Sequence, residues 1–431
     1  MLNIGKEGKN ALWLIFGRII QMLISFFVNI LSARYLGPNN YGLVNYGLAY
    51  VSFFTSLCTL GLNSVIIRNF VEFPEEEGQA IGTALLLRII SSILSVIMIW
   101  CIVSVVDKNE PLTKSVVLLS SISLIFHVFE TFNFWFQSKY KSKVTSIATL
   151  LAYTLVATYK IILLILSKNI LWFAVANSID YILIALFLYL AYKKSKGPRL
   201  CFSKYKAKQL LEKSWHYILS GMMIAVYGQT DKLMLKHMLN EAEVGYYATA
   251  TSLSLCWVFV LSAIIDSMYP TIIAYHKKSK EAFNEKNKQL YSIVIYLSFF
   301  VSIFISIFGY QGILFLYGEN FLGAVTPLSI VTWYTALSYL GVARNAWIVC
   351  ENKQRYLKYM YFNAALLNVL LNYILIPKYA ASGAAIASLV TQLSTSIILP
   401  FFIKEMRPNC KLMLQAINPK ILISFVKKFN N

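Results

Sequence analysis

Several charged side chains lie inside long apolar stretches of this chain, where a charge is costly and is usually kept for function. They are Arg18, Arg88, Glu130, Lys160, Asp180, Asp231, Lys232, Asp266 and Arg344. The three arginines fall in separate stretches. A guanidinium keeps its charge and presents a planar fork that suits phosphate oxygens. Arg18, Arg88 and Arg344 therefore predict a binding site for an anion within an apolar environment.

The carboxylates in these stretches suggest a second chemistry. An unpaired carboxylate buried among apolar helices can take up a proton or bind a sodium ion, and Asp180 is the strongest candidate by its depth. A structural partner for Asp180, such as a lysine or a tyrosine, is an equally good interpretation. Glu130 and Asp266 could likewise pair with the arginines as structural ion pairs. Lys160 is expected to extend toward the outer membrane interface.

Polar residues accompany the charges at helical spacing. Arg18, Gln21, Ser25 and Asn29 recur every three or four residues and so share one helix face. A similar stripe in the next apolar stretch ends at Asn63. We expect Gln21, Asn29 and Asn63 to bind the polar part of a substrate, although small polar residues also pack transmembrane helices against each other.

The elements that must position these residues are transmembrane helices. The chain is 58% hydrophobic, and its mean hydropathy is +0.61. A helix needs about 20 mostly apolar residues to cross a bilayer, and it satisfies its own backbone hydrogen bonds there. We expect an all-α integral membrane protein with about twelve spans, at residues 12–33, 41–66, 81–105, 115–137, 144–166, 170–192, 214–237, 246–273, 290–310, 325–349, 358–376 and 382–403.

The distribution of positive charge predicts the orientation of the spans. Most of the 39 Lys and Arg residues fall in alternate loops, on the side that also holds both termini. By the positive-inside rule this side is cytoplasmic. The formal net charge of +20 is therefore explained by topology, and we expect no nucleic-acid partner.

The longest polar segment divides six spans from six. We expect an N-terminal lobe at 1–192, a basic cytoplasmic linker at 193–213, a C-terminal lobe at 214–403 and a basic cytoplasmic tail at 404–431. The linker would either lie on the anionic leaflet, with 203–213 as a surface helix, or be solvated. Two six-span halves in one orientation are typical of transporters with a cavity between the lobes.

Signals for catalysis are weak. His127 and Glu130 lie three residues apart, but no further pair of ligands supports a metal site. The six cysteines form no CxxC motif, and no nucleotide-binding or nucleophile motif occurs. We expect a protein that is not an enzyme and has no cofactor beyond a coupled proton or sodium ion, whose identity the sequence does not indicate.

Four longer motifs carry a family resemblance. They are LSARYLGPNNYGLVNYGLAYVSFFTSLCTLGLNSVIIR at 31–68, TDKLML followed by EVGYYATA near 230–250, ARNAWIVCENKQRYLKY at 343–359, and NYILIPKYAASGAAIASLVTQ at 372–392. They resemble, in matching order, the bacterial flippases for O-antigen and exopolysaccharide repeat units. These flippases are a branch of the multidrug, oligosaccharidyl-lipid and polysaccharide exporter superfamily. The likeness extends from about residue 10 to 403.

The resemblance implies two six-helix lobes and alternating access around a cationic central cavity. It implies a substrate of undecaprenyl pyrophosphate carrying one oligosaccharide repeat unit, loaded from the cytoplasmic side of a bacterial inner membrane. The pyrophosphate would meet Arg18, Arg88 or Arg344. Arg34 in the ARYLG motif, and Asp231 with Lys232 in the TDK motif, would act in gating, in ion coupling or at the interface. A polysaccharide polymerase and a chain-length regulator are further candidate partners.

Other functions remain open at this point. The closest is export of drugs or of a peptidoglycan precursor by a member of the same superfamily, although precursor exporters commonly have two more helices. A membrane polysaccharide polymerase is a more distant alternative, because such an enzyme is expected to carry a large external loop, and the outer loops of this chain are short.

Overall fold

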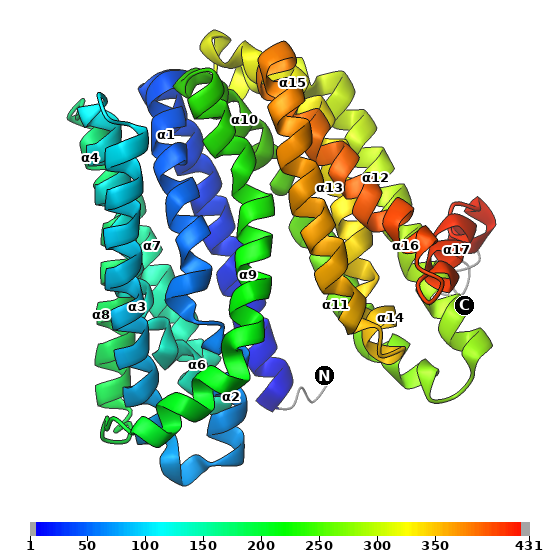
Figure 1. The fold of residues 1–431 in the computed structure, drawn as a ribbon, viewed down its shortest axis with the longest axis horizontal. Coiled ribbons are helices and arrows are strands. Elements are labelled where there is room, and N and C mark those ends of the chain that lie inside the picture. Colours follow the sequence, from blue (N-terminus) through cyan, green and yellow to red (C-terminus); the bar gives the residue numbers. More distant parts are fainter. Residues whose placement is uncertain (1–5, 424–431) are drawn as a thin grey trace. The chain divides into compact units, whose positions relative to one another are not determined.

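The computed structural model describes residues 6–423, with the side chains of residues 6–12, 14–16, 18, 64 and 227 outside the described set. These residues are almost entirely helical, with short turns and no strand among them (Figure 1). The α-helices are α1 (Lys6–Thr59), α2 (Leu62–Glu72), α3 (Glu77–Val106), α4 (Pro111–Ser121), α5 (Ser123–His127), α6 (Glu130–Ser138), α7 (Ser142–Ile165), α8 (Ile170–Lys194), α9 (Lys204–Met238), α10 (Glu241–Leu255), α11 (Val258–His276), α12 (Lys280–Leu316), α13 (Val325–Ala343), α14 (Asn345–Cys350), α15 (Leu357–Leu393), α16 (Leu399–Phe402) and α17 (Arg407–Gln415). Short 3-10 turns η1 (Pro74–Glu76), η2 (Glu319–Ala324) and η3 (Gln354–Tyr356) and the π-helical turn η4 (Ser394–Ile398) complete the order.

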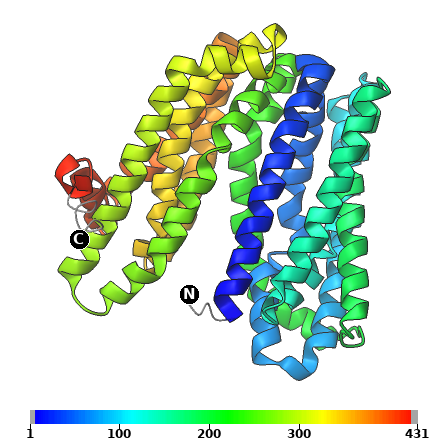
Figure 2. The same ribbon diagram turned by 180° about the vertical axis from the view of Figure 1, so that it is seen from behind.

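The chain divides into two compact units, Met1–Gln229 and Thr230–Asn431, and the division falls within α9. In the first unit α1 packs along α7 and α4, and α7 packs on α8 (Figures 1 and 2). Its core joins residues of α2, α3, α6, α7 and α8, including Ile66, Ile81 and Phe132. In the second unit α13 packs against α12, α15 and α10, around a core that includes Phe283 and Trp347.

The predicted class of fold is confirmed. Among the described residues, nine helical segments are long and apolar enough to cross a membrane. Two of these segments, Ile19–Thr59 and Gln354–Phe402, have 41 and 49 residues, which is enough for two spans each. Each contains a backbone break, at Gly37 (φ 69°) and Ala380 (φ 51°) respectively. The nine segments thus account for eleven of the twelve expected spans, and α9 (Lys204–Met238), where a span was expected at 214–237, is not among them. The protein is an all-α membrane protein with close to the expected number of spans.

Several predicted spans are interrupted rather than continuous. The span expected at 41–66 stops at Thr59 and resumes at Leu62, because Leu60 and Gly61 both take a positive φ. The span expected at 325–349 is divided into α13 and α14 at Arg344, and the one at 115–137 into α4, α5 and α6, but the backbone at Arg344, Ile122 and Val128 stays helical. The break at Leu60 and Gly61 differs, because it frees backbone carbonyl groups that lipid cannot satisfy, so another group of the protein has to do so.

The segment between α8 and α9 is bound to the first unit. Within residues 195–203, which we call the α8–α9 strap, the Cys201 amide donates to the carbonyl of Gly78 at 3.2 Å, and the Ser203 amide donates to Thr83 Oγ1 at 2.9 Å. A Cβ on Gly82 would lie 2.4 Å from the carbonyl oxygen of Cys201, so only glycine allows this approach. Lys206, at the start of α9, is buried and paired with Glu76. The strap is therefore packed against α3 and continues directly into α9.

Candidate functional site

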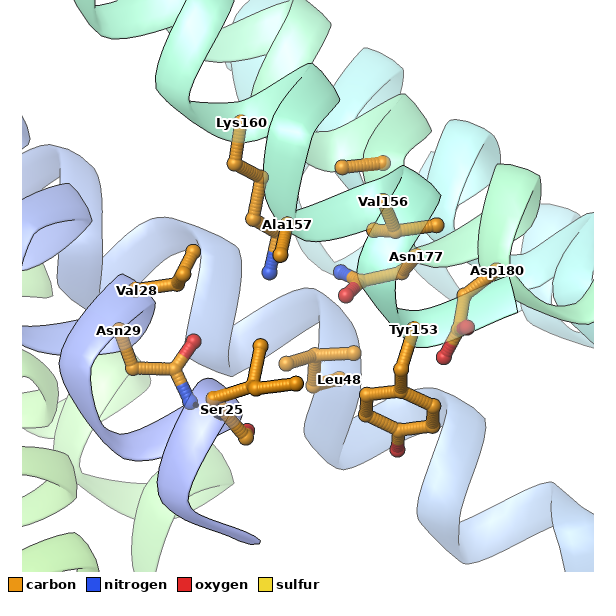
Figure 3. Close-up of a pocket in the computed structure, with 12 residues that line it drawn as sticks. Ser25, Val28, Asn29, Leu48, Tyr153, Val156, Ala157, Lys160, Asn177 and Asp180 are labelled. Atoms are coloured by element: carbon orange, nitrogen blue, oxygen red, sulfur yellow. Dashed lines mark hydrogen bonds between the residues drawn. The ribbon is translucent and has the colours of Figure 1, made fainter. Parts of the chain in front are cut away.

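A polar cavity of about 150 Å³ lies inside the helices of the first unit. Its wall is formed by α1, α7 and α8, which the packing of α7 between the other two brings together. Figure 3 shows its polar lining residues, which are Ser25, Asn29, Tyr153, Lys160, Asn177 and Asp180. A cavity of this composition among apolar spans is unusual, because polar groups in a membrane protein normally find partners or mark a functional site.

Two groups in this cavity lack partners. The carboxylate Oδ1 of Asp180 and the amide Nδ2 of Asn177 are buried and have no hydrogen bond among the described residues. Lys160 extends from α7 into the cavity toward α1 (Figure 3), and it does not form a direct ion pair with Asp180. On α1, Asn29 Nδ2 donates to Ser25 Oγ at 3.2 Å. The cavity therefore offers an acceptor, a donor and a cation to a bound ion or a polar ligand.

The sequence anticipated only part of this cavity. Asn29 and Asp180 were expected at a site, and the structure brings them to the same one. Lys160 was expected to extend toward the outer interface, but it points into the cavity instead (Figure 3), because its position on α7 faces α1. Gln21 is half-buried on α1 and hydrogen-bonds with Tyr153. The side chain of Arg18 lies outside the described residues.

Arg88 lies elsewhere in the first unit, with an exposed fraction of only 1%. Its Nε donates to the carbonyl of Thr59 at 3.2 Å, its Nη1 donates to Thr131 Oγ1 at 2.8 Å, and its Nη2 donates to Asn63 Oδ1. Thr59 ends α1 and Asn63 begins α2, so the guanidinium spans the interruption between these helices. Arg88 and Asn63, both expected at a substrate site, are thus bonded to each other.

Arg344 occupies a comparable position in the second unit. It lies at the junction of α13 and α14, is 4% exposed, and donates through Nη1 to the carbonyls of Thr395 and Ser396, both at 3.2 Å. These carbonyls belong to the π-helical turn η4. Its Nε has no partner, and no carboxylate of the described residues lies within ion-pairing distance. Arg344 is therefore a buried cation with an unused donor and no counter-ion.

Neither Arg88 nor Arg344 forms the expected structural ion pair with Glu130 or Asp266. Glu130 contacts His127, with Oε2 and Nδ1 3.4 Å apart, and Asp266 is exposed on α11. Arg34 is also exposed, near the middle of α1. Both Arg88 and Arg344 instead hydrogen-bond to neutral acceptors.

Asp231 is the centre of a hydrogen-bond cluster in the second unit. Its side chain is 3% exposed. Oδ1 accepts from Asn372 Nδ2 at 2.6 Å and from Asn368 Nδ2 at 3.2 Å, while Oδ2 accepts from Ser388 Oγ at 2.6 Å and from the hydroxyl of Tyr247. These donors come from α10 and from both sides of the Ala380 break in α15. The Asp231 carboxylate is thus fully bonded, in contrast to that of Asp180, and the adjacent Lys232 is half-buried.

The sequence analysis did not identify the hydrogen-bond partners of Asp231, nor Asn177 beside Asp180 in the polar cavity. Asn368 and Asn372 are spaced by four residues and could have been identified as a polar face of one helix. Tyr247 and Ser388 lie in the motifs EVGYYATA and NYILIPKYAASGAAIASLVTQ, so motifs distant in sequence meet at Asp231. In the first unit, Asn177 precedes Asp180 by one helical turn, which is a readable signal for a shared face.

Comparison with solved structures shows that this arrangement of apolar helices is the fold of known membrane transporters. The chain is similar to "Lipid II flippase MurJ, inward closed conformation", with 14% identity, a TM-score of 0.74, and coverage of 96% of this chain and 92% of that one. It is similar to an inward-facing multidrug resistance MATE family transporter of the MOP superfamily, with 15% identity, a TM-score of 0.68, and 90% and 94% coverage. A MOP superfamily transporter from Pyrococcus furiosus Vc1 (DSM3638) gives 15% identity, a TM-score of 0.64, and 94% and 97% coverage. At these identities the likeness shows the fold, which is that of the MOP superfamily.

The family follows from the sequence itself. The model of the family described as "Polysaccharide biosynthesis protein" matches residues 8–276, which is more than half of the chain. The protein belongs to this family. A comparison with curated proteins finds no match. The expected membership of a polysaccharide biosynthesis family is therefore confirmed.

Proposed function

We propose that the protein moves undecaprenyl-pyrophosphate-linked oligosaccharide repeat units from the cytoplasmic to the outer leaflet, by alternating access, for the synthesis of a surface polysaccharide such as O-antigen, capsule or exopolysaccharide. The protein would lie in the inner membrane of a bacterium with both termini in the cytoplasm. Membership of a polysaccharide biosynthesis family supports this function, as does the similarity to a lipid II flippase. A polymerase and a chain-length regulator would receive the product.

The observation that carries the proposal is the uncompensated charge of Arg344. A buried cation without a counter-ion is unfavourable, so a bound anion would stabilise it. The pyrophosphate of the carrier lipid is such an anion, and the unused Nε of Arg344 offers it a charge-assisted hydrogen bond. Arg18 is kept as a second candidate for this contact. Arg88 contributes mainly by holding α1 and α2, because its three donor nitrogens are already bonded.

The polar cavity of the first unit would serve sugar binding and ion coupling. The amides of Gln21 and Asn29 suit sugar hydroxyl groups, which both donate and accept hydrogen bonds. Asn63 would support this role only indirectly, through Arg88. The unpaired Asp180 Oδ1 is the best candidate to take up a proton or a sodium ion during transport. Nothing in the cavity distinguishes these two ions.

The remaining charged residues are proposed to act in gating or coupling. Asp231 joins three helical segments through its four hydrogen bonds, so a rearrangement of α15 at Ala380 would have to break some of them. Lys232 and Glu130 are half-buried, and Asp266 and Arg34 are exposed, so a substrate or a moving helix could reach them.

The second candidate is export of a drug or a peptidoglycan precursor. The similarity to multidrug transporters of the MOP superfamily favours it. The two candidates differ in what they need from Arg344, because a cationic drug gains nothing from a buried arginine, whereas a pyrophosphate does.

Reconstituted vesicles test the proposal. Vesicles that contain the purified full chain and fluorescent undecaprenyl-pyrophosphate oligosaccharide should expose the glycan to an external modifying enzyme faster than empty vesicles do. Arg344→Met should reduce this rate by about tenfold or more, as expected for one lost charge-assisted bond. Arg355→Met, which changes an exposed arginine, is the control. Absence of glycan movement by the wild-type protein, together with export of a cationic dye, would support the second candidate.

A further inference from the structure

A second pocket in the first unit lies outside the polar cavity described above. It has a volume of about 460 Å³, within the range of small-molecule sites. One wall is a face of α2, formed by Val65, Arg68, Asn69 and Glu72 at helical spacing. The other wall is the first part of α9, from Gln209 to Tyr217. The positive-inside pattern predicts that this pocket opens on the cytoplasmic side.

One buried polar atom that lines the pocket lacks a hydrogen-bond partner among the described residues. Asn69 is only 4% exposed, and its Oδ1 has no hydrogen bond among the described residues. A buried amide oxygen without a donor is unfavourable, because it has lost its hydrogen bonds to water and gained none from the protein. Asn69 lines the pocket, so a ligand that brings a hydrogen-bond donor can relieve this cost. The pocket is thus prepared for a ligand with hydroxyl or amide groups.

The charges of the pocket argue against a simple anion site. Arg68 and Lys213 are balanced by Glu72 and Glu212, and Arg68 Nε is already bonded to Glu72 Oε1 at 2.6 Å. An anion would therefore meet as much repulsion as attraction. Carboxylates and amides on opposite walls instead provide the acceptors and donors that neighbouring hydroxyl groups require.

The apolar parts of the pocket fit the same ligand. Val65 and Leu210 contribute apolar surface, and the ring of Tyr217, which is 54% exposed, lines the wall of α9. An aromatic ring with a polar end packs against ligands that have one apolar and one polar face. A sugar ring has both, since its C–H groups gather on one face and its hydroxyl groups surround it.

We propose that this α2–α9 pocket binds a sugar of the repeat unit on the cytoplasmic side before translocation. The inference rests on the proposed function, since it assigns a recognition site to the same substrate. Tyr217 packs on the sugar ring, Asn69 accepts a hydrogen bond from a hydroxyl or acetamido group, and Glu72 accepts from a further hydroxyl. The pocket thereby selects the glycan and leaves the carrier lipid to other parts of the protein.

Binding measurements in nanodiscs test the proposal with two probes. One probe is undecaprenyl-pyrophosphate oligosaccharide isolated from the producing cells, and the other is undecaprenyl pyrophosphate without sugar. The wild-type protein should bind the first more tightly. Tyr217→Ala and Asn69→Ala should each reduce this preference by about fivefold to tenfold, the effect of one or two lost contacts, with no change in the affinity for the bare carrier. Tyr205→Ala is the matched control, because Tyr205 is a 74% exposed tyrosine of α9 outside the pocket.

Each of the other outcomes rejects either the pocket proposal alone or the proposed function as well. If the wild-type protein binds neither probe, the proposed function fails and the pocket proposal fails with it. If it binds both equally, or if the variants keep the preference for the glycan, only the pocket proposal fails. Equal weakening of both probes by Tyr217→Ala would assign the pocket to the carrier and also reject sugar binding.

Discussion

The Nε of Arg88 donates a hydrogen bond to the carbonyl oxygen of Thr59, the last residue of α1, at 3.2 Å. This carbonyl is freed by the positive φ angles of Leu60 and Gly61, and lipid could not satisfy it. Arg344 does the same for two carbonyls of η4 in the second unit. Each unit therefore contains a buried arginine that satisfies an irregularity of the backbone.

Replacement of Arg88 should therefore mainly lower the stability of the protein, and should affect transport only through that loss. Arg88→Ala leaves the acceptors of Thr59, Asn63 and Thr131 without a donor, so we expect a loss of about 2–4 kcal/mol in the free energy of unfolding. Thermal unfolding of the purified protein in detergent measures the change, with Arg355→Ala as the exposed control. A stable Arg88→Ala protein with impaired transport would instead place Arg88 in the substrate site.

Asp180 and Asp231 should respond differently to the same substitution. Asp180→Asn removes a carboxylate whose Oδ1 has no partner, so the protein should fold normally and lose the dependence of transport on a proton or sodium gradient. Asp231→Asn replaces one of the two carboxylate oxygens, which together accept four hydrogen bonds, with an amide group that can only donate. The donors that faced this oxygen lose their acceptor, so the substitution should lower the unfolding temperature and the yield of folded protein. Proteoliposome transport with and without an ion gradient, beside thermal unfolding, separates the two effects. Loss of gradient dependence in a stable Asp231→Asn protein would move the coupling role to Asp231.

Lys160 offers a direct test of the polar cavity. Lys160→Met keeps the length of the side chain and removes its charge from the cavity, so glycan transport should fall by about tenfold while the fold is retained. Lys168→Met changes an exposed lysine in the turn after α7 and should have no effect. Equal transport by both variants would remove Lys160 from the site.

Gly61 should be far less tolerant of alanine than Gly312, a glycine inside α12. Gly61 takes a left-handed conformation, with φ 59° and ψ 14°, which disfavours a side chain by about 1–2 kcal/mol. A Cβ on Gly61 would also lie 2.9 Å from the carbonyl oxygen of Ser214 and 2.7 Å from the Cβ of Tyr217, whereas Gly312 has open space around it. Gly61→Ala should thus cost about 2–5 kcal/mol more than Gly312→Ala. Thermal unfolding of the two variants gives the difference directly, and equal midpoints would show that α9 can move away from the break.

The sequence predicted the elements better than their interactions. Hydropathy and helical spacing indicated the spans, because these depend on the local chain. The role of Arg88 depends on where α1 stops, and the single glycine at position 61 indicates that point only weakly, because isolated glycines also occur inside transmembrane helices. Lys160 was misjudged for a related reason, since the direction in which a long side chain extends depends on which neighbouring helix leaves room for it. Asp231 was identified, but its partners lie 16 to 157 positions away in sequence.

The α8–α9 strap has a practical consequence for anyone who wants to cut or label this protein. A long polar connection such as the one between α8 and α9 would ordinarily be the first choice for a fluorescent tag or a protease site. Here the backbone of Cys201 and Ser203 is part of the packing of α3, so an insertion there should unfold the first unit. The turn after α11, at Lys277 and Lys278, is a better place, because both residues are exposed and lie between helices.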